Sequence, residues 1–198
     1  MDRQETRIII AGFGGQGIVV IGNVIARAAV NENKNAVGMV SYGAEMRGGT
    51  ANASVVISDE EIFNPFVANP DVAIVLNQPS LDRFEPQVKK DGLILMNTSM
   101  IKRGPQRTDI KCIKVDATQI AQEIGNLRVA NIVSVGAFIK HTNLLSMNSI
   151  EQAIKDLFSN KAPKLVEINL KALHTGAEQS SVGIASVSSA TTTRPSIA

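Results

Sequence analysis

Residues 7–18 read RIIIAGFGGQGI, and this stretch decides the fold. The β-branched run 7–11 predicts a short buried strand that stops at the glycines. The segment 18–30 that follows predicts a helix that is apolar nearly all round, apart from a polar stripe made by Asn23, Arg27 and Asn31. A helix this apolar needs its flanks covered by the domain or by a partner, so it is a first indication of assembly.

Strands and helices are expected to alternate along the rest of the chain. The continuous apolar run 72–76 predicts a central parallel strand. Further strands are expected at 36–40, 51–58, 93–96 and 112–115, and helices at 81–88 (capped by Ser80), 117–124, 132–140, 150–158 (capped by Ser149) and 166–173. This order predicts a Rossmann-like, doubly wound α/β domain with a mostly parallel sheet and helices on both faces. The domain is expected to span 1–178, and the Ser/Thr/Ala-rich segment 179–198 to be a disordered tail.

Composition excludes several classes of function. The net charge is only +2 and aromatic residues make up 4%, so neither nucleic acid nor an anionic membrane surface is an expected partner. The single cysteine, Cys112, begins an apolar strand and is expected to be a core residue rather than a nucleophile. The opening MDRQE has no apolar signal region and no apolar run reaches the length of a membrane span, so a cytoplasmic location is expected.

The segment from Gly12 to Gly17 matches G-x-G-x-x-G between a predicted strand and a predicted helix. Its glycines allow a tight turn and a close approach of the backbone to a ligand, and the free N–H groups at a helix start favour an anion. The alternative is a tight turn that binds nothing. The candidate binding residues are Gly12, Gly14, Gly15, Gln16 and Gly17.

A nicotinamide dinucleotide site also requires an acidic residue about 20 positions further on, at the end of the second strand. Residues 39–42, which read MVSY, carry no carboxylate at this place. Glu45 is nearby but lies inside a second glycine-rich segment. The dinucleotide interpretation therefore loses weight.

This second segment, residues 42–50, reads YGAEMRGGT. Three glycines around a glutamate and an arginine can bring backbone, carboxylate and guanidinium groups together. The guanidinium could hold a phosphate or a carboxylate in a two-pronged hydrogen bond, or the glutamate and arginine could simply order the loop by pairing with each other. The candidate binding residues are Tyr42, Glu45, Arg47, Gly48 and Gly49.

The motifs GFGGQGI (12–18) and YGAEMRGG (42–49), in this order and spacing, resemble the gamma subunit of 2-oxoacid:ferredoxin oxidoreductases. The resemblance covers about residues 7–173. It implies an enzyme that decarboxylates a 2-oxoacid on thiamine diphosphate, passes electrons through iron–sulfur clusters to ferredoxin and transfers the acyl group to coenzyme A. Pyruvate, 2-oxoglutarate, ketoisovalerate and indolepyruvate are substrates in this family, and 2-oxoglutarate is expected here.

The chain lacks a Gly-Asp-Gly motif of the kind that holds thiamine diphosphate and Mg²⁺ in that family, and it lacks a cysteine array for clusters. These groups are therefore expected on alpha, beta and delta partner chains, and this chain is expected to be a non-catalytic subunit that binds no metal. Its glycine segments are expected to help shape a coenzyme A site, and its apolar first helix predicts self-association when the chain is isolated. An NAD(P)-binding reductase domain and a phosphate-binding scaffold protein are the alternatives.

Overall fold

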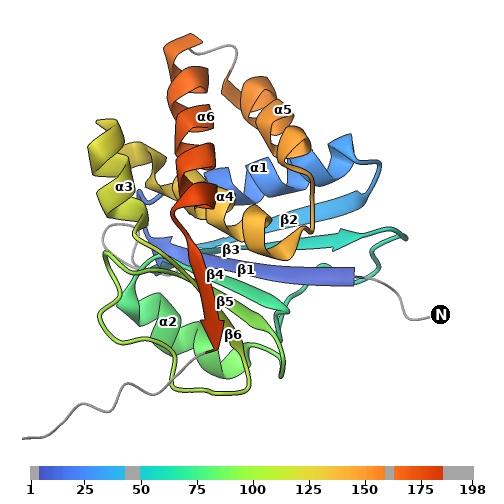
Figure 1. Cartoon of the computed structure of the whole chain (residues 1–198). Helices are drawn as coiled ribbons and strands as arrows, with labels where there is room; N and C mark the ends of the chain where they lie inside the picture. The colour runs from blue at the N-terminus through green and yellow to red at the C-terminus, as the bar shows by residue number, and fades with distance from the viewer. Residues whose placement is uncertain (1–4, 43–49, 159–162, 185–198) are drawn as a thin grey trace, which may run out of the picture.

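The strands of the computed structural model, which describes residues 5–42, 50–158 and 163–184, form one sheet in the order β2-β3-β1-β4-β5-β6-β7 (Figure 1). The strands are β1 (Glu5–Phe13), β2 (Asn35–Tyr42), β3 (Thr50–Ser58), β4 (Val72–Val75), β5 (Leu93–Asn97), β6 (Lys111–Val115) and β7 (Ser181–Ile184). The α/β class is confirmed, as are the predicted strands, each within two residues at either end.

The sheet is more mixed than the sequence predicted. β1, β4, β5 and β6 are parallel neighbours, whereas β3 is antiparallel to both β1 and β2, and β7 is antiparallel to β6. Residues 43–49 are too few for a helical crossover, so the chain returns from β2 as an antiparallel strand. β3 thereby occupies the place between β2 and β1.

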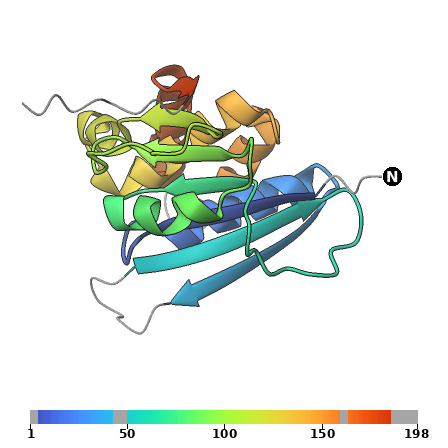
Figure 2. The same cartoon turned by 90° about the horizontal axis from the view of Figure 1, so that it is seen from below.

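Helices cover both faces of the sheet, as predicted. They are α1 (Ile18–Asn31), α2 (Gln78–Phe84), α3 (Ala117–Ile124), α4 (Ala130–Thr142), α5 (Met147–Phe158) and α6 (Pro163–Glu178), with 3₁₀ turns at Glu85–Gln87 and Leu127–Val129. α1 and α4 pack on one face beneath α5 and α6, and α2 lies on the other face (Figures 1 and 2). None of the described helices is long and apolar enough to cross a bilayer.

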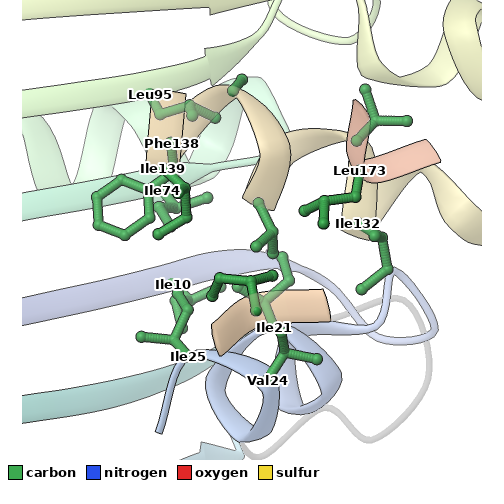
Figure 3. Packing of buried hydrophobic residues seen from close by; sticks show 14 of the residues in the cluster. Ile10, Ile21, Val24, Ile25, Ile74, Leu95, Ile132, Phe138, Ile139 and Leu173 are labelled. Atoms are coloured by element: carbon green, nitrogen blue, oxygen red, sulfur yellow. The ribbon is translucent and has the colours of Figure 1, made fainter. Parts of the chain in front are cut away.

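The main core lies between the sheet and α1 and α4. Ile10 and Ile74 of the central strands meet Ile21 and Ile25 of α1 and Phe138 of α4, and all five side chains are fully buried (Figure 3). The opposite face of the same strands packs under α2 in a smaller cluster. Alternate residues of each central strand thus enter different cores, which explains why these strands read as continuous apolar runs.

For two helices the predicted N-cap residue is wrong, and in both the true cap lies three positions earlier in the chain. Asn77, not Ser80, caps α2, since its Oδ1 accepts a hydrogen bond from the Ser80 N–H at 2.9 Å. Ser146 Oγ likewise accepts from the Ser149 N–H at 3.1 Å at the start of α5. A capping side chain accepts from the N–H three residues later, and both predictions selected that donor residue instead of the cap.

The last helix and the tail also differ from the prediction. α6 continues through Gly176 to Glu178 instead of ending at 173, because Gly176 lies directly against α4. Within the predicted tail 179–198, residues Ser181–Ile184 form β7 on the outer edge of β6, and 185–198 lie outside the described residues. Four residues are too few to show a strand period in sequence, while the open edge of β6 offers backbone hydrogen bonds.

Glu32 at the end of α1 is expected to contribute to stability in a pH-dependent way. Burial raises its pKa, but hydrogen bonds from the Ser146 N–H (2.6 Å) and from the hydroxyls of Ser149 and Ser146, with the charge of Lys34, lower it more, so the pKa is below its usual value. We expect Glu32→Gln to lower the free energy of unfolding by about 1 kcal/mol at neutral pH.

A carboxyl with a depressed pKa stabilises the fold above its unfolded-state pKa and loses this effect as the pH falls through the folded-state pKa. Urea unfolding of wild type and Glu32→Gln should therefore converge in acid. A difference that widened as the pH fell would contradict the assignment.

Candidate functional site

The glycine turn from Gly12 to Gly17 lies where β1 ends, at the edge of the sheet that also holds the carboxyl ends of β4, β5 and β6. Ligands of open α/β sheets bind at this edge. Gly15 (φ 92°) and Gly17 (φ 76°) adopt the left-handed conformation that side chains disfavour. Gly14 and Gly15 are exposed, and a Cβ on either would meet nothing within 4 Å, so this side of the turn is open to a ligand.

The other two glycines of the motif face the protein. A Cβ on Gly12 would lie 2.6 Å from Gln16 Oε1 and 2.8 Å from Ile18 Cδ1, and one on Gly17 would overlap the side-chain amide of Asn131. Gly12 and Gly17 thus pack closely against the side chains around α1 and α4, and at Gly17 the positive φ adds to the preference for glycine. Of these four glycines, Gly14 and Gly15 are therefore accessible to a ligand, whereas Gly12 and Gly17 face the protein.

The side chain of Gln16 stabilises the turn through hydrogen bonds. Its Oε1 accepts hydrogen bonds from the Phe13 N–H at 2.6 Å and from Asn77 Nδ2 at 3.2 Å. Asn77 is 1% exposed, and its own oxygen caps α2 through Ser80. The turn after β1 is thus joined to the helix after β4. Because the Gln16 oxygen is already engaged, its side chain offers a ligand only N–H donors.

The start of α1 adds further donors. Gly17 occupies the N-cap position, and no side chain among the described residues caps the first turn. The first N–H groups of a helix have no partner inside the helix, and the helix dipole makes its N-terminus attractive to anions. Together with Gln16, the turn presents donors to an acceptor-rich group such as a phosphate or a carboxylate.

The second predicted segment is connected to the same edge. Tyr42 ends β2, Thr50 begins β3, and Thr50 is the register partner of Phe13 in the glycine turn. The chain therefore leaves and re-enters the described sheet beside the turn. The candidate residues Glu45, Arg47, Gly48 and Gly49 lie outside the described residues, and the placement of their side chains stays a prediction.

The strand order weighs against a dinucleotide site. Such a site takes its acidic residue from the carboxyl end of the parallel strand that neighbours β1. Here the neighbour on that side is β3, which runs antiparallel and presents its first residue, Thr50, beside the turn. The sheet therefore does not supply the ribose-binding carboxylate at the usual place.

Two residues at the turn escaped the sequence-based prediction. Asn77 directly follows the apolar run of β4, so a polar residue at the carboxyl end of a central strand was a usable signal. Asn131 of α4 is 5% exposed, and its Nδ2 lies 3.5 Å from the Gly17 carbonyl oxygen. It reaches the turn from 114 positions away, and only its place within the folded chain reveals it.

Cys112 is fully buried beneath α2, as the sequence predicted, and burial raises the pKa of its thiol to about 11. Since the thiolate is the reactive form, we expect Cys112 to resist alkylation by N-ethylmaleimide in the native protein and to react in urea. Mass spectrometry of the labelled protein measures both states. Rapid labelling without denaturant would show that the site opens readily.

The described part of the chain holds no group of three or more His, Cys, Asp or Glu side chains that could bind a metal ion. His141 Nε2 lies 3.0 Å from Ser180 Oγ, where it joins α4 to the turn before β7. His174 Nε2 lies 3.2 Å from a carboxylate oxygen of Glu151 and joins α6 to α5. Both histidines therefore have structural contacts.

Residues 7–179 match a family model described as pyruvate ferredoxin/flavodoxin oxidoreductase. The ketoisovalerate oxidoreductase subunit VorA of Methanothermobacter marburgensis is 39% identical over 176 residues; the match covers 88% of this chain but only 36% of VorA, so the chain spans about a third of that relative. The 2-oxoglutarate synthase subunit KorC of Methanocaldococcus jannaschii is 40% identical over 180 residues, which cover 89% of this chain and 93% of KorC.

A solved structure with a similar fold is the gamma subunit of a keto/oxoacid ferredoxin oxidoreductase from Geobacter sulfurreducens. It superposes with a TM-score of 0.78 at 29% identity, and the match covers 88% of this chain and 95% of that one.

Proposed function

The chain belongs to the pyruvate ferredoxin/flavodoxin oxidoreductase family, and we propose that it is the gamma subunit of a 2-oxoacid:ferredoxin oxidoreductase. The observation that carries the proposal is the match to KorC, which is 40% identical and is covered over 93% of its length. In the proposed reaction a 2-oxoacid loses carbon dioxide, its acyl group passes to the thiol of coenzyme A, and the electrons released reduce ferredoxin.

The catalytic groups of this reaction belong on other chains. Thiamine diphosphate with Mg²⁺ supplies the decarboxylation chemistry and iron–sulfur clusters carry the electrons, but this chain has one cysteine, which is buried, and no Gly-Asp-Gly motif. Clusters of this kind are held by several cysteine thiolates. We therefore assign these groups to alpha, beta and delta partner chains of a cytoplasmic complex that delivers electrons to ferredoxin.

The role proposed for this chain is to contact coenzyme A. The open glycines Gly14 and Gly15, the Gln16 amide and the start of α1 form a donor-rich surface that suits the phosphates of that co-substrate. Arg47 would add a charged contact from the neighbouring segment. In this role the chain's residues bind and orient coenzyme A without exchanging protons or electrons with it.

We propose 2-oxoglutarate as the substrate. KorC is a 2-oxoglutarate synthase subunit of about the same length as this chain, whereas VorA, a ketoisovalerate oxidoreductase subunit, carries the matching region within a much longer chain. The preference rests on this correspondence together with the higher identity of KorC, 40% against 35% for the common gamma subunit of the pyruvate/ketoisovalerate oxidoreductases of Pyrococcus furiosus, which is also of about this length.

The first test is a pull-down of the tagged chain from its native cell, followed by an assay of viologen or ferredoxin reduction with each candidate 2-oxoacid plus coenzyme A. We expect partner chains with thiamine and cluster motifs, and activity with 2-oxoglutarate. Activity with only pyruvate or only a branched-chain oxoacid would show that this oxoacid, and not 2-oxoglutarate, is the substrate. Recovery of the chain without such partners would overturn the subunit assignment.

Arg47→Ala tests the contact with coenzyme A in the assembled enzyme. We expect the KM for coenzyme A to rise roughly tenfold, the equivalent of one charge-assisted hydrogen bond, while the KM for the oxoacid stays the same. Arg83→Ala, on the exposed surface of α2, is the matched control and should change neither constant. An unchanged KM for coenzyme A in Arg47→Ala would leave the segment with a purely architectural role.

A further inference from the structure

The sheet ends on one side at β2, whose outer backbone edge has no neighbouring strand in the described chain (Figure 2). In an antiparallel pair, alternate residues point their N–H and C=O groups away from the partner. About half of the residues of β2 therefore present unpaired donors and acceptors outward along an edge of eight residues. The opposite end of the sheet, β7, has only four residues.

β2 carries none of the devices that usually protect an edge strand. Natural edges are blocked by charged side chains, prolines, bulges or shortness. The sequence of β2, NAVGMVSY, has no charge and no proline, and its pairing with β3 is continuous over all eight residues without a bulge. Lys34, which directly precedes β2, forms an ion pair with Asp59 at 2.5 Å.

Apolar surface accompanies this edge. Val40 is 45% exposed on β2, and Val37 and Met39 of the same strand are only half-buried. Burial of such side chains favours association, and the uncharged strand meets no like charge in a second copy of itself. We infer that β2 is a self-association edge, on which a second copy of this chain adds its own β2 antiparallel about a two-fold axis.

The register of this pairing follows from side-chain alternation. Residues directly opposite each other in a sheet point to the same face, so the two residue numbers of each pair must add to an even sum. With the axis at Gly38, Ala36 of one copy meets Val40 of the other, and Val37 meets Met39, so apolar residues pair on both faces. With the axis at Met39, Val37 would instead meet Ser41.

An isologous contact of this kind closes after two copies. Pairing of β2 with β7 of another copy would be a head-to-tail contact, which forms a ring or an open filament instead of a dimer, and the four residues of β7 offer a much shorter contact. The symmetric dimer is therefore the favoured assembly. It does not depend on the function proposed above.

The test is the mass of the full chain in solution, measured by light scattering after gel filtration at micromolar concentration. We expect a dimer for the wild type and a monomer for Gly38→Lys, which places two lysines opposite each other at the axis. A Cβ on Gly38 would meet only the Ser54 carbonyl oxygen at 4.0 Å, so this variant should fold, and its thermal unfolding verifies this. Val182→Lys, exposed on β7, is the matched control and should stay dimeric.

A second variant tests the register directly. Gly38→Cys should give a disulfide-linked dimer under mild oxidation, since opposite side chains across a sheet lie about 5 Å apart; the buried Cys112 leaves little background. A monomeric wild type, a dimer that survives Gly38→Lys, or a dimer lost in Val182→Lys would each overturn the inference. A dimer disrupted by Gly38→Lys but not linked through Gly38→Cys would overturn the register.

Discussion

Replacement of Gly136 by alanine is expected to lower the free energy of unfolding by about 3 kcal/mol or more. α4 and α6 cross in backbone contact at this residue. A Cβ on Gly136 would overlap the carbonyl oxygen of Leu173 and lie 2.8 Å from its carbonyl carbon. The contact is reciprocal, since a Cβ on Gly176 would overlap the carbonyl oxygen of Val133. Backbone atoms cannot rotate out of the way, so the helices must separate and unpack the core beneath them.

Gly22→Ala is the matched control for this prediction. Gly22 is also a buried helical glycine, but its Cβ would lie 3.6 Å from Val55 Cγ2 and 3.7 Å from Ile10 Cδ1, which is ordinary contact. We expect this variant to gain up to about 1 kcal/mol from the higher helix propensity of alanine. Urea unfolding of both variants should shift the midpoint in opposite directions. Equal shifts, or a Gly136→Ala protein as stable as the wild type, would show that the α4–α6 crossing is not tight.

The elements of the fold were predictable where burial leaves a recognisable pattern of apolar and polar residues in the sequence. The run 72–76 identified the central strand because both faces of β4 are buried, and the polar stripe of α1 was visible because Asn23 and Arg27 are exposed. The antiparallel insertion of β3 was not predictable from periodicity, because a strand alternates in the same way in either direction. The end of α6 was missed because the apolar period is lost from Ala172 onward, where Gly176 packs its backbone directly against Val133.

The part of the candidate site that is formed by backbone groups was predictable from the sequence. The glycine turn was recognised because its conformations require glycine at fixed spacing, as Gly15 and Gly17 confirm by their positive φ angles. The side chains behind the turn come from other elements. Asn77 bonds Gln16 of the turn, and its place directly after β4 was the one local signal. Asn131 reaches the turn because α4 packs beside α1, and this proximity leaves no local pattern in the sequence.

Gly17→Ala is expected to cost about 2 kcal/mol of stability and to reduce formation of acyl-coenzyme A by the assembled enzyme about tenfold. The residue has φ 76° and ψ 28°, a conformation that strains alanine, and the added methyl would overlap the Asn131 amide. Relief of that overlap displaces either the buried Asn131 amide or the start of α1, and a displacement of α1 moves the N–H groups proposed to hold coenzyme A.

Gly14→Ala separates the effect on stability from the effect on the binding of coenzyme A. Its φ is not positive, and the methyl would meet nothing within 4 Å inside the protein, so thermal unfolding should be close to that of the wild type. The same methyl would point into the open side of the turn, so the KM for coenzyme A should rise if a ligand lies there. If Gly14→Ala left this KM unchanged while Gly17→Ala lost both stability and activity, the turn would be a structural joint between β1 and α1, and the phosphates of coenzyme A would have to bind elsewhere in the complex.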